Sequence, residues 1–175
     1  MDIISKQCAP LLSTFKMPIT GIKCDKEVIE SLLEMRDKRN YRFIIYKIRR
    51  GGKGCINFCR KGKRESDFLD FLRDVPKDEP RYIVYDFSYI TENWEKRDRL
   101  LFIFWSPEKA RKENKVTYSG TKSTILKELD KVFAMKKVEL TEYEELNENE
   151  LIGFGQPLRE KKNSLVGVET ITINT

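Results

Sequence analysis

Histidine is absent from this 175-residue sequence, and so are long hydrophobic runs. Without histidine, the chain lacks the Ser-His and Cys-His pairs that activate nucleophiles in many enzymes. A zinc ion at the C-x3-C pair Cys55 and Cys59 would need two more ligands, and histidine cannot supply them, so we expect no metal. No run reaches the roughly 18 apolar residues that a membrane-spanning helix requires.

Glycine-rich catalytic motifs are missing as well. The sequence contains no G-x-x-x-x-G-K, no G-x-G-x-x-G after a predicted strand and no G-x-S-x-G. The paired carboxylates Glu144 and Glu145 fall on an acidic, exposed-looking helix, where a solvated surface is the favoured interpretation. We therefore expect a protein that is not an enzyme and uses no cofactor.

The N-terminal residues lack the features of a targeting signal. They have neither the basic start nor the unbroken apolar run of a secretory signal. We interpret residues 1–18 as a flexible extension, with Met17 as an alternative start, and residues 19–175 as one domain. The cysteines are expected to be reduced thiols in the cytoplasm; they are Cys8, Cys24, Cys55 and Cys59.

Positive charge is in excess, with 34 Lys and Arg against 28 Asp and Glu and a net charge of +6. This excess indicates an acidic partner, which could be nucleic acid, an anionic lipid or an acidic protein surface. Aromatic residues near basic clusters can bind nucleic acid. Here they alternate within predicted strands, which is typical of a core; they are Phe43, Tyr46, Phe102 and Phe104.

The pattern of elements predicts an α/β sandwich, with a mixed sheet of five to six strands and helices on both faces. Asp25 is placed to cap the first helix, and Pro107 ends a strand that is apolar on both faces and therefore central. Gly51-Gly52 forms the turn of the first hairpin. Strands are predicted over 41–48, 53–59, 81–90, 99–105, 136–140 and 165–173, and helices over 26–38, 65–74, 111–130 and 141–152.

Four stretches resemble the actin-depolymerising factor/cofilin family, whose fold is the ADF-homology fold, a gelsolin-like architecture. TGIKCDKEVIESLLEM is similar to the family's N-terminal segment and first helix. RYIVYDFSYI and KRDRLLFIFWSPEKA resemble its central hairpin, and KVTYSGTKSTILKEL resembles its long actin-binding helix. YEEL and LVGVETI resemble its last helix and tail, so the resemblance spans roughly residues 19–173.

The resemblance implies a monomeric actin-binding protein of the cytoplasmic actin cytoskeleton, with the nucleus as a further location. It would bind actin monomers and filaments, prefer ADP-bound actin, and promote filament depolymerisation and severing. Phosphoinositide lipids are a further implied partner, and nucleic acid is not expected.

The resemblance also assigns site residues. The surface for monomers and filaments would comprise Thr20, Gly21, Ile22, Lys115, Val116, Thr121, Lys122 and Lys127. Its helical members are expected to face outwards and to enter a groove on actin. The filament-binding residues would be Lys96, Arg97, Arg99 and Glu148. Thr20 occupies the place of a phosphorylated serine, where phosphate would repel an acidic partner.

Four positions depart from the family pattern. Val116 replaces a usual methionine, Gly120 a serine or alanine, Leu126 a basic residue and Asn149 an arginine. These departures bear on filament affinity and severing more than on monomer binding. Two alternatives stay open: a relative that acts on filament branches or binds filaments without disassembling them, and a basic nucleic-acid-binding domain.

Overall fold

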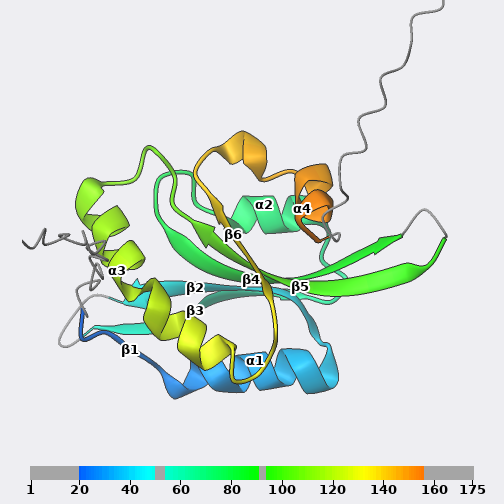
Figure 1. The fold of residues 1–175 in the computed structure, drawn as a ribbon, viewed down its shortest axis with the longest axis horizontal. Helices are drawn as coiled ribbons and strands as arrows, with labels where there is room; N and C mark the ends of the chain where they lie inside the picture. The colour runs from blue at the N-terminus through cyan, green and yellow to red at the C-terminus, as the bar shows by residue number, and fades with distance from the viewer. Residues whose placement is uncertain (1–19, 50–53, 91–93, 156–175) are drawn as a thin grey trace, which may run out of the picture.

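One sheet organises the chain, and the computed structural model describes residues 20–49, 54–90 and 94–155 (Figure 1). Six strands follow the order β1-β3-β2-β4-β5-β6. The inner strands are antiparallel neighbours: β2 (Tyr41–Arg49), β3 (Cys55–Lys63), β4 (Arg81–Ile90) and β5 (Lys96–Trp105). The outer strands β1 (Lys23–Cys24) and β6 (Lys136–Leu140) pair in parallel with β3 and β5. The mixed sheet is as predicted, and β5 is an inner strand, paired with β4 on one side and β6 on the other.

Helices cover both faces of the sheet, which confirms the predicted α/β sandwich (Figure 1). On one face, α1 (Lys26–Lys38) and α3 (Lys112–Leu129) enclose a core that includes Leu32, Phe102 and Ile125. On the other face, α2 (Phe68–Asp74) and α4 (Glu148–Gly155) enclose a core that includes Phe71 and Leu151. The strand aromatics are buried as predicted; they are Phe43, Tyr46, Phe102 and Phe104.

The first helix forms where the sequence predicts it. The Asp25 carboxylate accepts a hydrogen bond from the backbone N–H of Glu27 at 3.3 Å and so caps the helix N-terminus. Inside the helix, the buried Ser31 hydroxyl donates to the carbonyl of Val28 at 2.9 Å and lies 3.1 Å from the Tyr46 hydroxyl. This buried polar link joins α1 to β2.

The prediction of one continuous helix over 141–152 is wrong. A 3-10 turn, η1 (Tyr143–Glu145), comes first, and α4 begins only at Glu148. The Glu145 carboxylate accepts hydrogen bonds from the backbone N–H groups of Thr141 and Glu142 at 2.8 and 2.9 Å. The Asn147 side chain then accepts from the N–H of Glu150 at 2.9 Å. Two separate caps thus begin two short elements.

Other element bounds differ by a few residues. Strand β3 extends to Lys63 because Gly62 leaves room for the Phe43 ring, which would lie 2.2 Å from an added Cβ. Helix α2 begins at Phe68, after a capping box between Asp67 and Asp70. Strand β5 begins at Lys96, three residues before the prediction, and β1 was not predicted.

Some predictions lie outside the described residues. They are the extension over 1–18, the alternative start at Met17, the turn at Gly51-Gly52 and the strand over 165–173.

Candidate functional site

Two tyrosines fasten helix α3 to the sheet. The Tyr118 hydroxyl accepts a hydrogen bond from the backbone N–H of Ile48 in β2 at 3.0 Å. The Tyr118 carbonyl accepts one from the Tyr82 hydroxyl of β4 at 2.5 Å. Burial raises the pKa of both tyrosines above the ordinary value, so the hydroxyls stay protonated near neutral pH. Ile125 and Leu129 of α3 are fully buried in the same core, which leaves α3 one outward face.

The outward face of α3 has an apolar centre. Val116 is 61% exposed. Lys112, Ser123 and Lys127 are also exposed and fall on the same side of the helix, at separations of four, seven and eleven residues from Val116. The sequence prediction included Val116 and Lys127 but missed Lys112 and Ser123. Counting helical turns from Val116 would have found both.

Two predicted members of this face do not point outwards. Thr121 is fully buried, because it lies three residues after Tyr118 and four before Ile125 on the inward stripe. The side chain of Lys122 is only 21% exposed; its ammonium pairs with Glu139. The expectation that both face outwards is wrong for Thr121. Lys122 is largely covered, and its charge is compensated within the chain. Lys115 is half-buried.

The residues before β1 lie against α3. The Thr121 hydroxyl donates to the carbonyl of Thr117 at 2.7 Å, so in its 2.8 Å contact with Thr20 it is the acceptor. Gly21 follows with a φ of +72°, a left-handed conformation that favours glycine. Ile22 then packs against the core under α1 and α3. The structure therefore brings the predicted N-terminal segment beside the predicted helix.

We call the exposed set the α3 surface; its members are Thr20, Gly21, Lys112, Val116, Ser123 and Lys127. Among the departures from the family pattern, Leu126 is half-buried and packs against the core below this surface. A hydrophobic residue at that position therefore extends the buried stripe of α3. Gly120 is buried, and Asn149 is exposed on α4.

A second group of predicted residues lies far from the α3 surface, on the β4–β5 hairpin that projects from the body in Figure 1. Lys96, Arg97 and Arg99 are all exposed, as is Glu148 at the start of α4. We call these four residues the hairpin surface.

The hairpin surface is divided between the two faces of the sheet. Arg97 pairs with Tyr89 and Arg99 with Phe87, two residues of the core beneath α2 and α4. Because side chains alternate along a strand, Lys96 points to the opposite face. The structure therefore places Arg97 and Arg99 on the face that α4 covers, and separates Lys96 from them.

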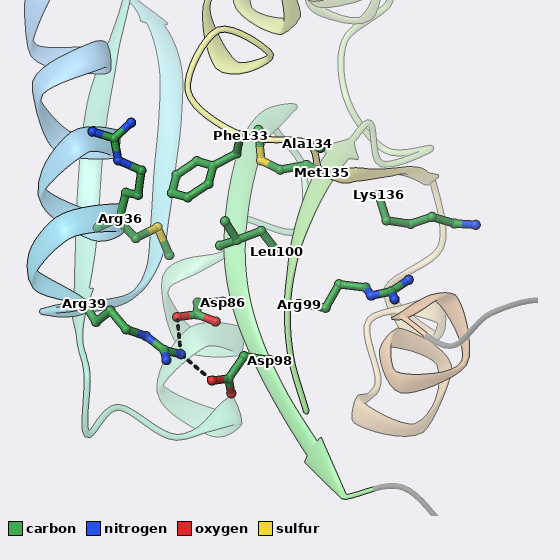
Figure 2. Close-up of a pocket in the computed structure, with 11 residues that line it drawn as sticks. Arg36, Arg39, Asp86, Asp98, Arg99, Leu100, Phe133, Ala134, Met135 and Lys136 are labelled. Atoms are coloured by element: carbon green, nitrogen blue, oxygen red, sulfur yellow. Dashed lines mark hydrogen bonds and ion pairs between the residues drawn. The ribbon is translucent and has the colours of Figure 1, made fainter. Parts of the chain in front are cut away.

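An ion-pair network holds the base of the hairpin (Figure 2). The buried Asp86 carboxylate of β4 pairs with Arg39, at 3.3 Å, and with Arg64. Asp98 of β5 accepts hydrogen bonds from the Ser88 hydroxyl and from Arg39, each at 2.7 Å. The Ser88 hydrogen bond, followed by those of Arg39, holds the pKa of Asp98 below its usual value.

A cavity of 650 Å³ opens beside this network, and its lining includes Leu100, Phe133 and Met135. Figure 2 shows Arg39 reaching between the carboxylates of Asp86 and Asp98. Its guanidinium is therefore occupied by the chain itself, and the network serves to hold α1, β4 and β5 together.

The described residues show no group with the geometry of a reactive or metal centre. Burial raises the pKa of the Cys24 thiol to about 11 and also raises that of Cys59, so both stay protonated at neutral pH. No cluster of three or more metal-ligating side chains occurs in this part of the chain. None of its helices is long and apolar enough to span a membrane.

Comparisons with known proteins agree on one family. A family model for cofilin/tropomyosin-type actin-binding proteins matches residues 21–153. Actin-depolymerizing factor 10 of Arabidopsis thaliana is 35% identical over 111 residues, which cover 63% of this chain and 79% of the relative. Actin-depolymerizing factor 2 of Petunia hybrida is 41% identical over 98 residues, which cover 56% of this chain and 68% of the relative.

Solved structures agree on the fold. The crystal structure of a Streptomyces griseoflavus cofilin matches with a TM-score of 0.68 and 24% sequence identity. The match covers 76% of this chain and 96% of that one, so the layered sheet and its helices follow the same arrangement.

Proposed function

The chain belongs to the cofilin/tropomyosin-type actin-binding protein family, and from this premise we propose that it binds actin monomers and filaments and promotes filament disassembly, including severing. The observation that carries the proposal is the outward face of α3. Val116 lies exposed at its centre, with Lys112 and Lys127 on the same face. An amphipathic helix with this pattern suits docking into an apolar groove.

Monomer binding is assigned to the α3 surface. The exposed Val116 side chain supplies the apolar contact, and the flanking lysines favour a groove with an acidic rim. Thr20 and Gly21 extend the contact beyond the helix, because the Thr20 hydroxyl bonds to α3. The rigid attachment of α3 through Tyr118 lowers the entropy cost of docking.

Filament binding adds the hairpin surface. The two surfaces lie towards opposite ends of the molecule in Figure 1, so one copy of the chain can reach two neighbouring actin subunits. Lys96 and Arg99 form no ion pair with any described residue and are therefore available to a partner. Tighter binding to one filament twist, and to ADP-bound subunits, would shift the filament towards that state and favour breaks at the boundaries.

Phosphorylation at Thr20 is the regulation that we assign to the α3 surface. A phosphate ester removes the hydrogen that Thr20 donates to Thr121, and it adds nearly two negative charges beside a basic surface. We expect Thr20→Glu to weaken monomer binding at least tenfold, while Thr20→Ser binds as the wild type does. Equal binding by Thr20→Glu in a nucleotide-exchange assay on actin monomers would contradict this assignment.

Lipid regulation and location follow from the same charges. Phosphoinositide headgroups would compete with actin for the exposed lysines of the α3 surface. We place the protein with the actin cytoskeleton of the cytoplasm, and also in the nucleus. Vesicles with and without a phosphoinositide, added to the monomer assay, test the competition; equal actin binding in both would count against it.

Co-sedimentation with ADP-actin filaments tests the proposed function. We expect the wild-type chain to pellet with filaments and to move actin into the supernatant. Val116→Asp should abolish both effects. Leu69→Asp is the matched control, because Leu69 is 59% exposed but lies on α2 across the sheet. A wild-type chain that stays in the supernatant and leaves filaments unchanged would overturn the proposal, and steeply salt-dependent RNA binding would then favour a nucleic-acid-binding domain.

A further inference from the structure

The free end of the β4–β5 hairpin exposes two large apolar side chains. Trp94 is 88% exposed and Ile90 is 63% exposed. They lie close to the end of the strand pairing, where Ile90 faces Lys96. The other tryptophan of the chain, Trp105, is fully buried at the opposite end of β5. Single exposed apolar residues are common on protein surfaces, so the case for a binding site rests on the backbone at Trp94 and on the residues that follow it.

The backbone at Trp94 makes its exposure more unusual. Its φ of 61° lies in the left-handed region, which is disfavoured for a bulky residue. Glycine would adopt that conformation without the steric cost. The fold therefore gains nothing from tryptophan here, and strained residues of this kind concentrate at functional sites.

The surroundings of Trp94 suit a protein partner better than a membrane. Between residues 94 and 99, three cations stand against two carboxylates. Arg97 pairs with Glu95, and Asp98 pairs with Arg39. These pairs leave Lys96 and Arg99 as the uncompensated cations of this described segment, and two cations are too few for stable adsorption to an anionic lipid surface, where each contributes about 1 kcal/mol. Tryptophan and arginine are instead the residues enriched at protein-binding hot spots, and Arg97 and Arg99 lie three and five positions after Trp94.

The hairpin also presents this end in a fixed direction. The Asp86 and Asp98 carboxylates tie its base to Arg39 at the C-terminal end of α1. Four paired positions of β4 and β5, from Phe87↔Arg99 to Ile90↔Lys96, continue beyond Asp86 to the exposed end, which points away from α3 in Figure 1. A preorganised apolar tip loses little conformational entropy on binding.

We propose that Trp94, assisted by Ile90, is the apolar anchor with which the hairpin docks into a hollow on the side of the actin filament. This inference rests on the proposed function and deepens it, because every predicted member of the hairpin surface is charged. The charged residues steer the encounter and set its salt dependence, whereas Trp94 sets how long the complex lasts.

Trp94→Ala tests the anchor. We expect filament affinity in co-sedimentation to fall at least tenfold, mainly through faster dissociation, while binding to actin monomers stays within twofold of the wild type. Trp94→Phe should recover most of the filament affinity. Leu69→Ala is the matched control, because it removes a comparably exposed apolar side chain from α2.

Trp94→Gly separates binding from folding. Glycine relieves the left-handed backbone, so the melting temperature should not fall, yet filament binding should be lost as in Trp94→Ala. If the wild type binds filaments and Trp94→Ala binds equally well, the anchor is overturned while the proposed function stands. If the wild type binds monomers but no filaments, both the anchor and the filament function fail. Equal loss of monomer binding in Trp94→Ala would also overturn the anchor.

Discussion

The α3 surface and the hairpin surface are supported by the same sheet in different ways. The α3 surface is the outer side of a helix whose inner side is core, with Tyr118, Thr121 and Ile125 all buried. The hairpin surface is the far end of two long strands whose last side chains meet solvent on both faces. A network of charges around Asp86 holds the base of the hairpin, in addition to the core residues Phe87 and Tyr89 on one face of β4.

Because of this difference, substitutions at the two surfaces should affect stability and binding differently. Substitutions under the α3 surface disturb buried contacts and should change stability and monomer binding together. Substitutions at the exposed end of the hairpin should change filament binding alone, and only those at its base should reach the fold. The following changes test this separation, in order of expected effect.

Asp86→Ala is expected to have the largest effect on stability, because it leaves Arg64 and Arg39 without their buried partner. Both arginines are partly solvated, so we expect the free energy of unfolding to fall by about 2 kcal/mol, less than for a fully buried pair. Urea unfolding measures it. Asp37→Ala, which breaks the exposed pair with Arg36, is the control and should leave the midpoint unchanged. Equal midpoints for both variants would show that the network does not hold the hairpin.

Tyr118→Phe tests the attachment of α3. The backbone N–H of Ile48 would lose its acceptor, and we expect a loss of about 1 to 2 kcal/mol in the free energy of unfolding. Monomer binding should weaken with it, while the hairpin keeps its structure. Tyr143→Phe is the control, because the Tyr143 hydroxyl donates over a longer 3.4 Å to the carbonyl of Leu72. A loss of stability without any change in monomer affinity would show that the attachment of α3 through Tyr118 does not contribute to monomer binding.

Gly21→Ala changes the segment beside α3. No atom lies within 4 Å of the added Cβ, so the cost comes from the left-handed backbone and should be about 1 kcal/mol. The segment would relax by moving Thr20 away from Thr121, which should weaken monomer binding more than it lowers the melting temperature. Gly153→Ala on the exposed side of α4 is the control, since its Cβ also meets no atom within 4 Å. Unchanged monomer affinity in Gly21→Ala would remove this segment from the α3 surface.

Asp98→Asn should have the smallest effect on the free energy of unfolding, and this effect should be present only above acidic pH. The pKa of Asp98 is lowered in the folded chain, so its ionised form adds stability above the unfolded pKa of about 3.9, and this is lost as the pH falls through the folded value. The stability difference from the wild type should therefore be present at neutral pH and vanish in strong acid. Ser88→Ala, which removes the first cause of the shift, should reproduce part of it. A difference that grows as the pH falls would contradict the sign.

Local signals predicted two element ends. The Asp25 cap predicted where α1 begins, and Pro107 predicted where β5 ends. The start of β5 was missed because exposed charged residues from Lys96 to Arg99 hide the strand pattern. The break before α4 was missed because the Asn147 cap competes with helix continuation, and sequence spacing does not rank the two.

The site was only partly predictable. The family resemblance identified Val116 and Lys127, which are exposed. Helical spacing would have assigned Thr121 to the inward stripe with Tyr118 and Ile125. The hydrogen bond between Thr20 and Thr121 spans 101 positions and depends on the tertiary fold. The exposure of Trp94 likewise depends on how the hairpin projects from the body, which sequence patterns do not give.

One paired measurement tests the central claim most directly. The dissociation constants for actin monomers and for actin filaments would be measured for the wild type, for Val116→Asp and for a combined Lys96→Glu and Arg97→Glu variant. We predict that Val116→Asp loses both affinities and that the charge-reversed hairpin loses only filament affinity, with monomer affinity within twofold of the wild type. Equal loss of monomer affinity in both variants would contradict the division of binding between the α3 surface and the hairpin surface.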